Sequence, residues 1–289
     1  MIYYMKDWVS PIPRKVHLIW IGTNSFPEYF KHFLKTFEKN FSEFEIKVWG
    51  NNDLKRKNFP LTFDYIQNAK RLQGKQMVDH EGYKMFDKNK KPLTYSKWAQ
   101  ITDLMRLEII YRNGGYYFDT TFEILKPMYN LLNKKGKRFV GCNEVPRFKD
   151  FDILSNSFFG ATPENPILKR LLSTKRLNDI DFYNSAVDFE TGPGYLRSGI
   201  RLSDNYLIFP TTYFYPFVEE YLPGQDPLYR KAKKNKCHSK KKTKKTNKRL
   251  KGKGNIRFPC DKYPKSYALK HWQLGKSWLV PEYYTEDDF

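Results

Sequence analysis

Two charged residues near the middle of the chain have the types and the spacing of a functional pair. Asp103 and Arg106 are three residues apart in a segment with helical periodicity, so their side chains lie on one face of the helix. The remaining positions are apolar nearly all round, which predicts that the helix is buried and that the pair is buried with it. A buried ion pair can simply lock a helix in place, so its meaning depends on its neighbours.

A third charged residue, Asp119, follows this pair after a glycine turn. Gly114 and Gly115 stop the helix shortly after Arg106, and a short strand over residues 116–119 begins at once. The strand brings Asp119 to its carboxyl end, and ligands of open α/β sheets bind at that edge. Helix, glycine turn and acidic strand end therefore predict one ligand site that contains all three charged residues.

The first fifty residues supply the elements that must position this site. Residues 15–21 form an apolar run that ends at Gly22, the pattern of a strand buried on both faces of a parallel sheet. A capping box with Pro27 then marks the start of a helix that turns its phenylalanines toward the sheet. Residues 45–49 have the pattern of the next strand. Strand, helix and strand predict a right-handed βαβ unit and an α/β fold.

The rest of the chain continues this pattern less regularly. Residues 51–94 are polar and weakly periodic, which predicts loops and short helices, and no internal repeat is visible. Downstream, the patterns predict a helix over 96–113, strands over 116–119, 138–142 and 157–161, a helix over 165–175, a turn over 191–194, an extended stretch over 206–217 and a last structured segment over 267–278.

The composition is that of a folded protein. The chain has 289 residues, of which 40% are hydrophobic and 17% aromatic, and this excludes an unfolded chain; we expect a single domain over residues 1–289. Three cysteines are too few for a disulfide framework and suggest a reducing compartment. No apolar stretch of roughly 18 residues and no signal peptide is recognisable, so we expect a cytoplasmic protein, and the residue usage fits a viral or intracellular microbial source.

One segment accounts for most of the net positive charge. The formal net charge is +21, but residues 230–253 hold 14 Lys or Arg and no acid, which leaves +7 for the rest of the chain. This segment cannot bury enough apolar surface to fold, so we expect a flexible lysine-rich insertion over residues 230–254. It can be a solvated loop, a nuclear address, or a contact for an anionic surface or a nucleic-acid backbone. It has no aromatic residue on which bases could stack, which argues against specific single-strand recognition.

Several blocks of the chain resemble one family of enzymes, the sugar transferases with a short Asp-X-Asp signature (family 32 type). This family includes the yeast initiating mannosyltransferases and, more distantly, the glucosylating bacterial toxins. The most specific block is Thr-Asp-Leu-Met-Arg at residues 102–106, followed by Tyr-Arg-Asn-Gly-Gly-Tyr-Tyr-Phe-Asp at residues 111–119. Supporting blocks lie at residues 12–22, 125–127, 191–193, 209–210, 214–216, 271–272 and 277–278.

The resemblance implies a retaining glycosyltransferase of the GT-A type, with a Rossmann-like, mostly parallel central sheet flanked by helices. Such an enzyme moves a hexose from a UDP- or GDP-sugar to a glycan or protein acceptor. By matched position, Trp20 would stack on the base, while Asp103 and Arg106 would hold hydroxyl groups of the donor sugar; Trp20 could equally be a plain core residue. Ser277 and Trp278 would close over the phosphates as a lid, or pack as the last core element.

The metal-binding part of the signature departs from the family. Asp119 would ligate Mn²⁺ or Mg²⁺ bridging the diphosphate, but Thr121 stands where a second Asp is expected, so we expect metal binding to be weakened or absent. Glu123 would lie roughly 13 Å from Asp119 along an extended strand, too far to share an ion, but a bend in the chain would make it a candidate again. His271 matches a late ligand position and would be the second ligand, or only a packed histidine. Alternatively, a basic residue replaces the metal, and the open candidates are Lys270, Lys276 and Arg197.

Retention of configuration leaves two routes, a covalent glycosyl intermediate or attack on the same face within an ion pair. The sequence offers no obvious carboxylate nucleophile, so the resemblance favours same-face attack with the diphosphate as proton acceptor. Two other functions stay open. One is a catalytically impaired GT-A fold that binds or scaffolds, which Thr121 suggests, and the other is a nucleic-acid-binding protein that acts through residues 230–253.

Overall fold

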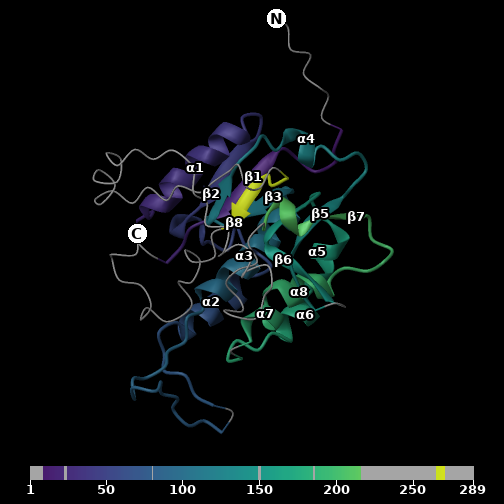
Figure 1. Cartoon of the computed structure of the whole chain (residues 1–289). Helices are drawn as coiled ribbons and strands as arrows, with labels where there is room; N and C mark the ends of the chain where they lie inside the picture. The colour runs from purple at the N-terminus through teal and green to yellow at the C-terminus, as the bar shows by residue number, and fades with distance from the viewer. Residues whose placement is uncertain are drawn as a thin grey trace, which may run out of the picture.

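A six-stranded sheet with the order β2-β1-β3-β6-β5-β7 forms the centre of the fold in the computed structural model, which describes residues 9–22, 25–79, 81–148, 151–184, 186–215 and 265–270. Helices lie on both sides of this sheet (Figure 1). Three of its five pairings are parallel, which confirms the α/β class and the mostly parallel sheet. The strands are β1 (Lys15–Ile19), β2 (Glu45–Trp49), β3 (Gly115–Phe118), β5 (Phe139–Phe148), β6 (Phe151–Ala161) and β7 (Tyr206–Phe209).

The first βαβ unit forms as the sequence predicts. β2 has the predicted bounds and pairs in parallel with β1, which ends two residues earlier than expected. Helix α1 (Glu28–Asn40) connects the two strands. The predicted capping box is wrong, because Pro27 occupies the N-cap and no side chain caps the helix.

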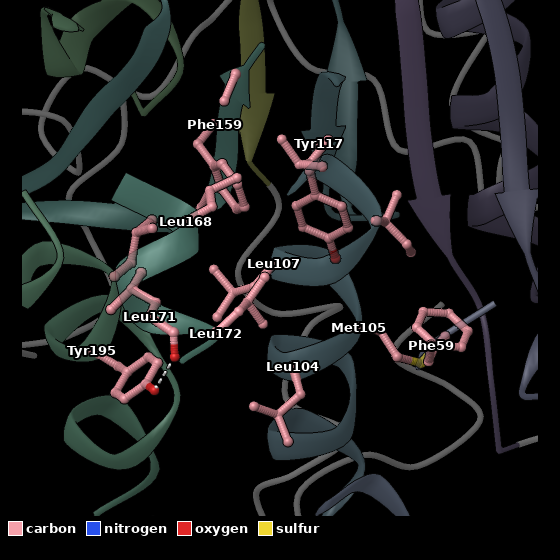
Figure 2. Close-up of a cluster of buried hydrophobic side chains, with 14 of the residues drawn as sticks. Phe59, Leu104, Met105, Leu107, Tyr117, Phe159, Leu168, Leu171, Leu172 and Tyr195 are labelled. Carbon is pink, nitrogen blue, oxygen red and sulfur yellow. Dashed lines mark hydrogen bonds between the residues drawn. The ribbon is translucent and has the colours of Figure 1, made fainter. Parts of the chain in front are cut away.

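Alternate side chains of β3 point into two separate hydrophobic cores. Tyr117 belongs to the core on the side of helix α3 (Trp98–Asn113), whereas Tyr116 and Phe118 belong to the core on the side of α1. Successive side chains of a strand point to opposite faces, so this short strand is buried on both. Figure 2 shows Tyr117 and Phe159 packed around α3, whose apolar side chains cover this face of the sheet.

The predicted helix over residues 165–175 is wrong as a single element. It divides into α5 (Pro166–Leu171) and α6 (Thr174–Asn178), because Ser173 is extended and takes the N-cap position that serine favours. The predicted turn over residues 191–194 runs between α7 (Val187–Glu190) and α8 (Pro193–Ser198). Tyr195 of α8 donates a hydrogen bond of 2.7 Å to the Leu171 carbonyl, which fastens α8 to α5 (Figure 2).

Strands β5 and β6 are longer than the apolar runs that predicted them. β6 is antiparallel to both β3 and β5, so the sheet changes direction there. The amino-terminal half of β6 was missed because Ser-Asn-Ser at residues 155–157 interrupts its apolar pattern. β3 ends one residue before Asp119, whose backbone N–H still donates to the Ser157 carbonyl at 2.9 Å.

Residues 51–94 form a short helical region and an excursion away from the sheet (Figure 1). The 3-10 turn η1 (Asn51–Asp53) and helix α2 (Phe63–Leu72) agree with the predicted loops and short helices. Beyond α2, three extended segments are joined by isolated antiparallel bridges. The two turns between these segments have the same hydrogen-bond pattern, because Asp79 and Asp87 each accept two hydrogen bonds from backbone N–H groups of their own turn.

A two-stranded sheet brings a late part of the chain beside the acidic strand end. β4 (Phe122–Ile124) pairs antiparallel with β8 (Ala268–Lys270). The short helices α4 (Tyr129–Leu132) and η2 (Thr211–Tyr213) complete the described elements, and η2 ends the predicted extended stretch after β7. The lysine-rich insertion and residues 271–278 lie outside the described residues. Within the described residues, no helix is long and apolar enough to cross a membrane.

Candidate active site

A glycine turn positions the site between α3 and β3. Gly114 and Gly115 have φ values of +63° and +95°, the left-handed region that glycine tolerates. A Cβ on Gly115 would lie 2.6 Å from the Lys15 carbonyl oxygen, so this close passage past β1 also requires glycine. The turn therefore lets one buried helix run directly into the central sheet, as the sequence predicts.

The three predicted charged residues meet in one chain of ion pairs. Arg106 Nη2 lies 3.1 Å from Asp103 Oδ1, and Arg106 Nη1 lies 3.3 Å from Asp119 Oδ1. The side chains of Asp103 and Arg106 are 6% and 7% exposed, whereas that of Asp119 is 24% exposed. The guanidinium thus bridges a buried carboxylate and one that reaches the surface.

Asp103 is held by further hydrogen bonds. Asn156 donates to its Oδ1 at 2.8 Å, and Thr191 donates to its Oδ2 at 2.9 Å. Burial raises the pKa of Asp103 to about 6, although the positive charge of Arg106 and the Thr191 hydroxyl act in the opposite direction. A carboxylate oxygen can accept two hydrogen bonds, so Oδ2 of Asp103 can accept another one besides that of Thr191.

Arg106 is fixed in orientation as well as in charge. Its Nη1 donates to the Asn156 carbonyl at 2.8 Å and its Nε donates to the Thr102 carbonyl at 3.2 Å. The guanidinium also lies over the Tyr117 ring, 4.5 Å from the ring centroid. Its Nη2 also donates to the Thr102 hydroxyl at 3.2 Å, so with the two ion pairs every N–H bond of this planar group faces a partner and its orientation is fixed.

Both oxygens of Asp119 have partners. Tyr117 donates its hydroxyl to Oδ1 at 2.7 Å, and the Lys270 ammonium pairs with Oδ2. Burial alone would raise the pKa of Asp119, but the charges of Lys270 and Arg106 outweigh it and hold that pKa at about 2. Asp119 is therefore ionised over the whole physiological pH range.

Trp20 follows β1 directly and joins an aromatic group from α1. Its ring stacks on Phe30 with centroids 5.6 Å apart, and Tyr29 packs edge-on against it at 6.5 Å. Burial raises the pKa of Tyr29 to about 12, and the negative charge of Asp119 adds to this effect. Tyr29 thus packs against Trp20 and also lies within the electrostatic influence of Asp119. Trp20 is half-buried, and its Nε1 has no hydrogen-bond partner among the described residues.

The amino-terminal part of the chain matches a known protein family. Residues 2–138 match the family described as glycosyltransferase sugar-binding region containing DXD motif. Over these residues the chain carries a glycosyltransferase sugar-binding region. The matched segment contains the whole glycine turn and all three members of the ion-pair chain.

Solved structures of glycosyltransferases match the chain at low similarity. The PaToxG glycosyltransferase is 17% identical, with a TM-score of 0.44, over 65% of this chain and 68% of that chain. The UDP-bound glycosyltransferase domain of the YGT toxin is 12% identical, with a TM-score of 0.40, over 68% and 79%. The galactosyltransferase LgtC, in complex with donor and acceptor sugar analogues, is 11% identical, with a TM-score of 0.38, over 75% and 81%. Among curated proteins, none matches the chain significantly.

The DXD family generally uses a divalent metal ion, and the described residues do not fit one. Asp119 already binds two cations, and Thr121 Oγ1 is buried and lacks a hydrogen-bond partner in the described part of the chain. The described residues also contain no cluster of three His, Cys, Asp or Glu side chains. The chain turns after Asp119, with Phe122 N–H donating to the Asp119 carbonyl, so the extended strand on which the exclusion of Glu123 depended is not present. His271 lies outside the described residues, as do Ser277 and Trp278.

The structure adds residues that the sequence did not single out. Asn156 reaches Asp103 from the middle of β6, and the only signal for it was a polar residue inside an apolar strand. Tyr117 was visible only as part of a motif, and Thr191 only as part of a downstream block. Of the three basic candidates, the structure places Lys270 at Asp119, whereas Arg197 is exposed on α8 and Lys276 lies outside the described residues.

Proposed function

We propose that this glycosyltransferase transfers a hexose, with retention of configuration, from a nucleotide-diphosphate sugar to a glycan or protein acceptor. The observation that carries the proposal is the position of Arg106 between two carboxylates. It joins the buried Asp103 to Asp119, which reaches the surface at the carboxyl end of β3. Rigid, directional donors and acceptors of this kind suit the adjacent hydroxyl groups of a sugar.

The proposed donor lies along a line from Trp20 to Asp103. The base stacks on the Trp20 ring, whose other neighbours are aromatic side chains of α1. The diphosphate lies at Asp119, next to the two cations Arg106 and Lys270. The sugar then faces Arg106 and Asp103, whose carboxylate retains acceptor capacity. In this arrangement Asp103 and Arg106 orient the sugar, and Ser277 and Trp278 close over the phosphates.

The reaction we propose is a displacement on one face of the sugar. The bond between the anomeric carbon and the diphosphate oxygen breaks, and its electron pair stays on the diphosphate. The acceptor hydroxyl oxygen forms the new bond to the anomeric carbon, and its proton passes to a diphosphate oxygen. No carboxylate of the described site is free of a cationic partner, which supports a route without a covalent intermediate. Mass spectrometry that trapped a glycosyl adduct on the protein would contradict it.

A requirement for Mn²⁺ or Mg²⁺ is expected to be weak or absent. A threonine hydroxyl is a poor replacement for a carboxylate toward a hard divalent ion. Binding of the ion by Asp119, Thr121 and His271, as the resemblance implies, is the alternative that a metal titration tests.

The experiment that tests the function is donor turnover. Purified full-length protein is assayed for hydrolysis and transfer with a panel of UDP- and GDP-sugars, once with EDTA and once with Mn²⁺. Arg106→Ala should lower turnover of the accepted donor at least about 100-fold, because it removes the ion pairs to Asp103 and to Asp119. Arg112→Ala is the matched control, since this exposed arginine on the same helix donates to the backbone carbonyls of residues 57 and 58 and is not part of the ion-pair chain.

A catalytically impaired binding protein is the second candidate, and the neutral Thr121 favours it. It predicts that no donor of the panel is hydrolysed or transferred under either condition. It also predicts that Thr121→Asp restores turnover with Mn²⁺. Turnover by the unmodified chain would exclude this candidate.

A further inference from the structure

We propose that Lys270 takes the place of the divalent metal ion, so that the donor diphosphate binds to a lysine and an arginine instead of a metal-bound pair of aspartates. This inference rests on the proposed function and names how the same site holds its donor. It starts from a contact between residues that are 151 positions apart, the ammonium of Lys270 on Oδ2 of Asp119.

The backbone builds this contact. β8 pairs antiparallel with β4 in a register that sets Lys270 opposite Phe122, three residues after Asp119. The Lys270 N–H donates to the Phe214 carbonyl at 3.2 Å, so a second segment holds the same residue. The ammonium also lies 5.3 Å from the centroid of the Phe122 ring. The Lys270 side chain is 4% exposed, which is rare for a lysine unless it is paired.

The charges of the four ion-paired side chains balance without a metal. Asp103 and Asp119 are offset by Arg106 and Lys270, through three ion pairs that share these four side chains. A divalent ion on Asp119 would have to displace the ammonium or lie beside it, and like charges at contact distance repel. Thr121 offers no second carboxylate that would compensate for this repulsion.

The two cations suit a diphosphate. An incoming donor brings negative charge to a site where Lys270 and Arg106 meet at the single carboxylate of Asp119. The ammonium is a compact point charge with three donors, which can contact Asp119 and a phosphate oxygen together. During transfer, the electron pair of the breaking bond stays on the diphosphate, and Lys270 neutralises it without giving up a proton.

The first test measures nucleotide binding without metal. UDP and GDP are titrated calorimetrically into EDTA-treated full-length protein, and again with Mn²⁺ present. We expect one nucleotide to bind with affinities that differ by less than about threefold between the two conditions, and Lys270→Met to weaken its binding at least about tenfold. Lys270→Arg should retain most of the affinity. Lys126→Met is the matched control, because this lysine lies beside β8 over the Tyr267 ring, 5.4 Å from its centroid.

The second test converts the site to the metal-dependent form. Thr121→Asp combined with Lys270→Met supplies the missing carboxylate and vacates Oδ2 of Asp119. Mn²⁺ binding is followed by the loss of the free-ion signal in electron paramagnetic resonance, which needs neither substrate nor turnover. We expect the double variant to bind Mn²⁺ at least about tenfold more tightly than the unmodified chain.

The outcomes separate the two proposals. Nucleotide binding that requires Mn²⁺, or that survives Lys270→Met in a folded variant, overturns the role of Lys270 and leaves the proposed function standing. Equal Mn²⁺ binding by the unmodified chain and the double variant overturns it too. The absence of UDP and GDP binding under every condition overturns the proposed function and this inference together.

Discussion

The indole N–H of Trp49 donates to Nδ1 of His17 at 3.2 Å, and Nε2 of the same imidazole lies 3.0 Å from the Gly114 carbonyl. An indole nitrogen can only donate, so Nδ1 must be the acceptor and Nε2 must carry the proton that reaches Gly114. This neutral histidine joins β1, β2 and the glycine turn that positions the site. A second proton on the ring would make Nδ1 a donor as well, and it would then face the N–H donor of Trp49.

Acid is therefore expected to weaken the fold through His17. Burial lowers the pKa of His17 from 6.5 to about 4, although the bond to Gly114 acts in the opposite direction. Because the pKa of His17 is lower in the folded than in the unfolded state, the contribution of neutral His17 to the free energy of unfolding is complete above pH 6.5. It is lost as the pH falls toward 4, and the loss amounts to at most about 3 kcal/mol. Urea unfolding between pH 7 and pH 4 should show that His17→Gln lacks this part of the pH dependence. An identical pH dependence of both proteins would contradict the prediction.

Gly115→Ala is expected to disrupt the turn. Its φ of +95° is strained for alanine, and the new Cβ would meet the Lys15 carbonyl oxygen at 2.6 Å, a backbone atom that cannot move aside. We expect a loss of about 2 kcal/mol or more in the free energy of unfolding. Gly136→Ala is the matched control, because Gly136 also has a positive φ but has open space around its Cβ position, so the loss should be about 1 kcal/mol. Equal losses would show that the close passage is unimportant.

The elements nearest to the site were predictable because their signals are local. The helix over 96–113 and the glycine turn follow from periodicity and from two adjacent glycines, and observed α3 differs only at its first two residues. The alternation of Tyr116, Tyr117 and Phe118 between two cores needs only the geometry of a strand.

The contacts between distant residues were not predictable in the same way. Asn156 and Lys270 reach the site from β6 and β8, and the direction and register of those strands depend on tertiary pairing that leaves no local pattern. The break between α5 and α6 was missed because residues 173–176 contain no glycine or proline that would mark the end of a helix. The capping box was predicted from a local motif, but the helix begins with Pro27 as its N-cap, so the motif does not stand at the N-cap position.

Asp103 is expected to act on stability in the direction opposite to His17. Burial raises its pKa from 3.8 to about 6, so the folded state holds a proton that the unfolded state has released. The contribution of protonated Asp103 to the free energy of unfolding is complete below pH 3.8. It is lost as the pH rises through about 6, and the loss amounts to at most about 3 kcal/mol. Asp103→Asn removes this titration and keeps one oxygen that can accept from Asn156, while its NH2 group can donate to the Thr191 hydroxyl. The difference in unfolding free energy between the two proteins should therefore change between pH 4 and pH 6, and a constant difference would refute the assignment.

Trp20 provides a test of the nucleotide end of the site. Its ring is half-buried and stacks on Phe30, so Trp20→Phe keeps most of the packing and part of the face on which a base could stack. We expect Trp20→Ala to weaken UDP or GDP binding about tenfold and Trp20→Phe to weaken it about threefold, as measured by calorimetry on proteins whose thermal unfolding has been compared. A plain core role predicts a different pattern, in which Trp20→Ala lowers the unfolding temperature while the folded fraction binds the nucleotide with unchanged affinity. That result would remove Trp20 from the donor site without affecting the ion-pair chain of Asp103, Arg106 and Asp119.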